Sequence, residues 1–154
     1  MGMRRFALGA LATILISASV ASVADAGNGG APRVATLSGS AQVPPADPDG
    51  TGFATIRLNL GQRRVCWEIS VSNIAPANAA HIHAGAAGVN GPILVPLSPP
   101  TNGSSSGCTE GVDRALIKDI IQHPDQYYVN VHNAEFPAWA IRGQLSNRGR
   151  SDGS

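Results

Sequence analysis

Short segments with a strict alternation of apolar and polar residues constrain the fold of this chain more than any other feature. Segment 63–74, RRVCWEISVSNI, has an apolar residue at every second position from Val65 to Val71. Segment 53–60, FATIRLNL, does the same from Ala54 to Leu60. A period of two is typical of strands that bury one face, as strands of antiparallel sheets do.

Similar reasoning predicts five more strands, at 33–40, 79–85, 91–97, 127–133 and 139–145. Glycines, prolines and serines in 41–52 and 99–108 predict loops. Residues 113–124 have apolar residues at helical spacing, with Asp113 as N-cap and Pro124 as terminator. We therefore expect an all-β fold: an antiparallel sandwich or barrel of about seven to eight short strands, with one short helix in a crossover.

The N-terminus has the pattern of a secretory signal. A basic start is followed by the apolar run FALGALATILISASV (6–20) and by small residues that end at Ala26. This predicts a signal peptide over 1–26, with cleavage after Ala26 and a secreted or periplasmic location. The alternative is a retained N-terminal anchor. We then expect a flexible lead at 27–32, one domain at 33–146 and a disordered tail at 147–154.

Charge and cysteine content narrow the function classes. Removal of residues 1–26 leaves equal numbers of acidic and basic side chains, without the basic surface of a nucleic-acid binder and without an attraction to anionic membranes. We expect no membrane insertion after cleavage. Cys66 and Cys108 fit neither a C-x-x-C redox motif nor a zinc cluster, and an even cysteine count in an exported chain favours a disulfide. The alternative is two buried thiols.

Three of the four histidines form the candidate site. His81 and His83, in AAHIHAG, lie two positions apart and therefore point to the same side of a strand. His132, in YYVNVHN, lies on the face of its strand opposite Val129 and Val131. If the two strands are neighbours, three imidazoles can meet at one ion. Imidazole ligands suit copper and zinc, among other transition metals. The alternative is a solvated polar patch.

Other residues are weaker candidates for a functional site. Glu135 and Arg142 flank Trp139 and could form an ion pair or part of a binding surface. No G-x-S-x-G elbow between a strand and a helix, as a catalytic serine needs, is evident, because GSSSG (103–107) lies in a predicted loop. No phosphate-binding glycine loop follows a strand. We therefore assign no catalytic residue.

The ordered motifs LSGSAQVPP, VCWEISVSNI, AAHIHAGAAGVNGPILVPL and IRGQL resemble the CHRD (chordin) domain, in its bacterial, exported, single-domain form. The resemblance runs from about Val34 to Leu145 and implies export and a β-fold, without implying a particular reaction. More locally, H-x-H on one strand and V-x-V-H on a later strand are similar to the copper ligands of copper-zinc superoxide dismutase. The bridging histidine, the zinc aspartate and the electrostatic loop of that enzyme are not identifiable.

Three interpretations of the function follow. The first is an exported binding domain, non-enzymatic, with a mononuclear copper or zinc site at His81, His83 and His132. The second is a copper-dependent redox enzyme. The third is a structural adhesion or matrix module without metal. The sequence does not identify a partner, although a protein partner at the surface is compatible with each interpretation.

Overall fold

The computed structural model describes residues 29–147, which form an all-β domain with one α-helix. The α-helix is α1 (Arg114–Gln122), and the single-turn 3-10 helix η1 (Pro124–Gln126) follows it. The strands are β1 (Ala31–Ser38), β2 (Thr51–Asn59), β3 (Arg64–Ser72), β4 (Ala77–Ala84), β5 (Ile93–Leu97), β6 (Ser104–Thr109), β7 (Tyr127–Asn133), β8 (Ile141–Gln144) and β9 (Ser146–Asn147).

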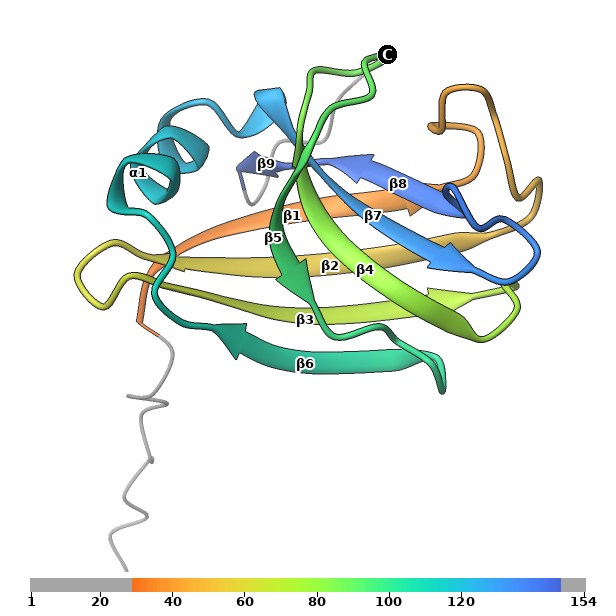
Figure 1. The fold of residues 1–154 in the computed structure, drawn as a ribbon, viewed down its shortest axis with the longest axis horizontal. Helices are drawn as coiled ribbons and strands as arrows, with labels where there is room; N and C mark the ends of the chain where they lie inside the picture. The colour runs from red at the N-terminus through yellow and green to blue at the C-terminus, as the bar shows by residue number, and fades with distance from the viewer. Residues whose placement is uncertain (1–28, 148–154) are drawn as a thin grey trace, which may run out of the picture.

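The strands form one antiparallel sheet that is nearly closed on itself. Their order is β5-β4-β7-β8-β1-β2-β3-β6, and the two-residue β9 pairs with β1. In Figure 1, β4, β5 and β7 cross at an angle over the layer that β1, β2, β3 and β6 form. The predicted fold class, an antiparallel sandwich or barrel with one helix in a crossover, is confirmed: α1 lies in the connection from β6 to β7.

Two side chains join the outermost strands, β5 and β6, along a seam. The Thr109 hydroxyl donates a 2.7 Å hydrogen bond to the carbonyl oxygen of Pro96, and the Ser105 hydroxyl donates one of 2.7 Å to that of Ser98. No backbone ladder pairs β5 with β6 in the described part of the chain. Side-chain hydroxyl groups, and not backbone hydrogen bonds, therefore join the two outermost strands of the sheet.

The core lies between the two layers and has the predicted alternation. Its members include Ala54, Ile56 and Leu58 of β2, Val65, Trp67 and Ile69 of β3, Ile82 of β4, and Val129 and Val131 of β7. Ile117 and Ile120 of α1 join the same cluster, so the helix also contributes to the core. The Asp113 side chain accepts a hydrogen bond from the Ala115 N–H, as expected of an N-cap. None of the helices in residues 29–147 is long and apolar enough to cross a membrane.

The disulfide predicted between Cys66 and Cys108 is present. The two residues lie directly opposite each other on β3 and β6, with their α-carbons 4.0 Å apart. Disulfides persist in oxidising compartments. The bond therefore supports such a compartment for this protein.

Several boundaries differ from the prediction. Residues 104–108, expected within a loop, form most of β6, because pairing with β3 and the disulfide override the weak strand propensity of serine and glycine. Asn147, expected in the tail, pairs with Arg33. Ala31 and Pro32, expected in a flexible lead, begin β1 and pair with β2. The predicted signal peptide, 1–26, lies outside the described residues, as does 148–154.

Candidate metal centre

Two neighbouring strands position the three histidines. His81 and His83 lie on β4, His132 lies on β7, and these strands pair antiparallel with Ala79 opposite His132. The register of β4 shifts twice: against β7 between Ala77 and Ala79, before the histidines, and against β5 between Ile82 and His83. Such bulges re-aim side chains and are frequent beside functional sites. Strand pairing thus brings His132 to the two histidines of β4.

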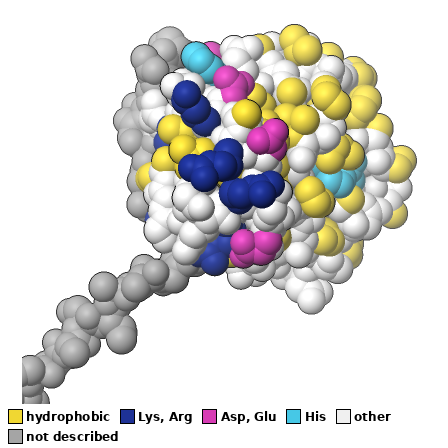
Figure 2. Space-filling model, turned by 60° about the vertical axis from the view of Figure 1, so that its left-hand side comes forward, with side chains coloured by type: hydrophobic (Ala, Val, Ile, Leu, Met, Phe, Trp, Pro, Cys, Tyr) yellow, Lys and Arg dark blue, Asp and Glu magenta, His cyan; other side chains and the backbone are white. Residues whose placement is uncertain are grey.

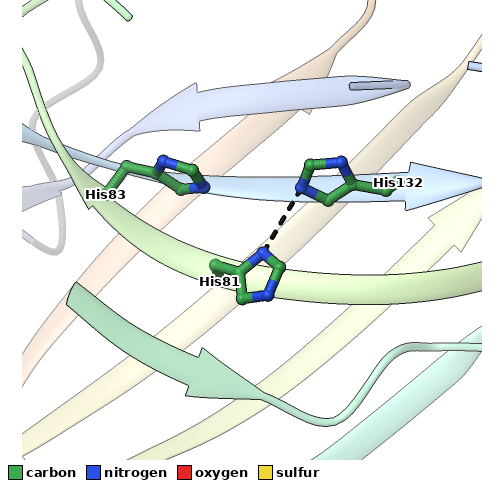
Figure 3. A group of neighbouring side chains, drawn as sticks. All are labelled: His81, His83 and His132. Carbon is green, nitrogen blue, oxygen red and sulfur yellow. Dashed lines mark hydrogen bonds between the residues drawn. The ribbon is translucent and has the colours of Figure 1, made fainter. Parts of the chain in front are cut away.

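The three imidazoles face one another (Figure 3). One nitrogen from each ring lies within 4.8 Å of a nitrogen from each of the others. The shortest separation, 3.3 Å, is between Nδ1 of His81 and Nε2 of His132. In the described part of the chain, this is the group of histidine, cysteine or acidic residues placed closely enough to hold a metal ion.

Backbone carbonyls determine which nitrogen of two rings carries the proton. Nδ1 of His83 lies 2.9 Å from the carbonyl oxygen of Gly91, and Nδ1 of His132 lies 3.2 Å from that of Pro137. A carbonyl oxygen only accepts, so each Nδ1 donates its hydrogen and each Nε2 of the neutral ring keeps a lone pair. Nε2 of His83 is buried and has no hydrogen-bond partner among the described residues. That lone pair is free to bind a cation.

Burial keeps two of the rings uncharged. Desolvation lowers the pKa of His81, and the neighbouring His132 and His83 lower it further. Desolvation also lowers the pKa of His83; the Gly91 hydrogen bond opposes this, whereas His132 and Arg142 add to it. A neutral imidazole is the form that binds metal. The lowered pKa values of His81 and His83 are therefore compatible with a cation site at neutral pH.

The family model of the CHRD domain matches residues 33–145, which are most of the chain. The chain belongs to the CHRD domain family. No curated protein and no solved structure matches it. The three clustered histidines of this CHRD domain, and both cysteines, lie within the matched range.

A stack of side chains that the sequence analysis missed supports His83 in this CHRD domain. The Tyr128 ring lies against His83, with ring centres 4.9 Å apart and an interplanar angle of 12°. The guanidinium carbon of Arg142 lies 3.5 Å from the centre of the same tyrosine ring. The tyrosine hydroxyl also accepts a hydrogen bond from the Gly91 N–H. Alternation along YYVNVHN places Tyr128 on the face of His132 and could have indicated it.

Glu135 and Arg142, expected to form an ion pair or part of a binding surface, do not pair with each other in the structure. Arg142 is 1% exposed and donates to the loop that joins β4 to β5, whereas Glu135 is exposed on the loop after β7. The ion pairs of the described residues are Arg64–Glu110 and His123–Asp119. Long-range packing against loop 85–92 determines the partners of Arg142, and a local sequence pattern carries no signal of that packing.

Proposed function

We propose that this CHRD domain is an exported, non-enzymatic binding protein that holds one transition-metal ion, copper or zinc, between His81, His83 and His132. One observation carries the proposal: three imidazoles converge, and the buried Nε2 of His83 has its lone pair unused. A buried polar atom without a partner costs free energy. A cation at this position would remove that cost.

The distances fit a shared ion. Two ligands that each lie about 2.0 to 2.1 Å from one ion, at a tetrahedral angle, are about 3.3 to 3.4 Å apart. The separation between His81 Nδ1 and His132 Nε2 is 3.3 Å. The remaining separations reach at most 4.8 Å, so closing the site needs an inward ring movement of about 1 Å.

The surroundings of the ligands also support a metal site. Histidine ligands commonly donate their second ring nitrogen to a carbonyl oxygen, which fixes the ring and its tautomer. The carbonyl groups of Gly91 and Pro137 are placed to do this for His83 and His132. His81 and His132 are half-buried, so the ion is reached from their side. Three protein ligands leave a coordination position for water or a small ligand.

Export is the second part of the proposal. The basic start, the apolar run 6–20 and the small residues up to Ala26 support it, and so does the disulfide. Expression of the full chain in a bacterial host should give a processed protein outside the cytoplasm, with Gly27 as first residue by N-terminal sequencing. A chain retained in the cytoplasm with its first residues intact would contradict export.

Metal analysis tests the site. The exported protein, stripped with a chelator and titrated with copper or zinc, should bind one equivalent. His83→Ala should abolish this binding, because it removes the buried ligand. His123→Ala is the matched control, because His123 ends α1 away from the site and should leave one equivalent bound. A wild-type protein that binds no metal would favour the structural module, and His83→Ala that binds as tightly as the wild type would place the ion elsewhere; either result contradicts the proposed site.

A further inference from the structure

Arg142 carries a buried positive charge that no carboxylate pairs with in the described residues. Its guanidinium group donates only to neutral acceptors. These are the carbonyl oxygens of Ala86 and Val89 and the side-chain oxygens of Asn90 and Gln144, at 3.0 to 3.3 Å. The hydrogen bonds hold the loop after β4 in place, and the charge itself is left without a counter-charge at ion-pair distance.

This charge lies close to the histidines. The guanidinium carbon of Arg142 is 3.5 Å from the centre of the Tyr128 ring. The same ring stacks on the His83 ring, with the two ring centres 4.9 Å apart. Together the two distances place the guanidinium within about 8 Å of His83, a range over which buried charges interact appreciably.

The side chains around the three histidines do little to screen the positive charge of Arg142. The cluster contains no acidic ligand, since all three members are histidines. Ile93, which pairs with His83 in register, and Val89 of the next loop are exposed apolar residues, at 53% and 51%. Figure 2 shows histidine surface bordered by hydrophobic side chains, whereas lysines, arginines and acidic side chains gather on another part of that face. Apolar surroundings screen a charge less than water does.

From these observations we infer that Arg142 sets the charge selectivity of the metal site, making it favour the monovalent cuprous ion over divalent zinc or cupric ion. The inference rests on the proposed function. Repulsion between the guanidinium and a bound ion grows in proportion to the charge of the ion. The three imidazoles supply no negative charge to offset it. The guanidinium group therefore repels a divalent ion about twice as strongly as a monovalent ion at the same position.

The test compares two probe ions, zinc and cuprous copper, which is kept reduced by the exclusion of oxygen. Each is titrated into the exported protein in competition with a chromophoric chelator, and the result is the ratio of the zinc to the cuprous Kd. Arg142→Gln should lower this ratio roughly five- to thirty-fold, because one unit of repulsion at this distance is worth about that much. Arg142→Lys, which keeps the charge, should change the ratio less.

A second variant does not depend on the folding of Arg142→Gln. The side-chain oxygen of Asn90 accepts a 3.2 Å hydrogen bond from Arg142, so Asn90→Asp places a carboxylate beside the guanidinium group. The variant loses the exposed hydrogen bond that the Asn90 amide donates to the carbonyl oxygen of Val43. The added counter-charge should lower the same ratio. Arg57→Gln, on the outer face of β2, is the matched control for loss of a distant positive charge and should leave it unchanged.

The outcomes separate the two ideas. If neither ion binds to the wild-type protein, the metal site is wrong and its charge selectivity with it. If both ions bind, and folded Arg142→Gln and Asn90→Asp keep the wild-type ratio within about two-fold, the metal site stands and Arg142 does not determine its selectivity.

Discussion

His81 and His83 lie where burial disfavours their charged forms, and this links the stability of the protein to pH. Desolvation is the largest cause of the lowered pKa of each ring. The unfolded chain binds these protons at the ordinary histidine pKa of about 6.5. Folding therefore releases protons, and stability rises with pH in the window between the folded and unfolded values.

For the metal-free protein we expect the free energy of unfolding to be fully maintained above about pH 6.5 and to decrease as the pH falls below it. Urea unfolding at a series of pH values between about 7.5 and 5 measures this. His83→Gln should show a smaller decrease over the same range, because the variant has one titrating ring fewer. A decrease as steep as that of the wild type would show that His83 does not contribute.

Single positions differ in how well the sequence reveals them. His81, His83 and His132 could be identified because each alternates with apolar residues along its strand. The apolar residues take one face of the strand, so the histidines must lie on the other. The partners of Arg142 could not be predicted, because its environment depends on loop 85–92 folding back onto β8. Alternation assigns a side chain to a face of a strand, but it does not show which loop covers that face.

At the scale of elements, the sequence missed the two-residue β9 and, more importantly, β6. Its residues, SSSGCT, have almost no apolar alternation, because β6 is an outermost strand with a ladder on one side only. Strands with an alternating apolar face, such as β2 and β3, were identified with boundaries within about two residues of the observed ones. Pairing with β3 and the Cys66–Cys108 disulfide therefore stabilise β6 as a strand despite the low strand propensity of its residues.

The disulfide between β3 and β6 should contribute strongly to stability. Cys66 and Cys108 are 42 residues apart in sequence, and closing a loop of this length is worth about 3 to 4 kcal/mol in the chain-entropy description. The double variant Cys66→Ser/Cys108→Ser should lose about that much free energy of unfolding in urea. Wild-type protein kept reduced should behave like the variant. An unchanged unfolding midpoint in both would rule out a stabilising role.

The seam offers a smaller and more local test. Thr109→Val keeps the shape of the side chain and removes the hydroxyl that donates to the Pro96 carbonyl oxygen. We expect a loss of about 1 kcal/mol in urea unfolding, the usual net value of one hydrogen bond. Thr55→Val, on β2 and away from the seam, is the matched control. Equal losses in both variants would mean that the seam bond adds nothing.

At the scale of the whole molecule, an ion at the three histidines would stabilise the entire domain. A ligand that binds only the folded state adds about 2.7 kcal/mol at a free concentration one hundred times its Kd. Copper or zinc should therefore raise the Tm of the wild-type protein and of His123→Ala, and a chelator should reverse the increase. His83→Ala should show no such increase. An equal increase in His83→Ala would place the bound ion elsewhere.

The nearly closed sheet also affects how copies of the protein meet. An open sheet edge presents unpaired N–H and C=O groups to which a strand of another molecule can add, and such addition begins aggregation. In this barrel the two edges, β5 and β6, face each other and are bound together by the hydroxyl groups of Thr109 and Ser105. The hydroxyl seam thus places each exposed edge against the other edge of the same molecule, where a strand of a second copy would otherwise add.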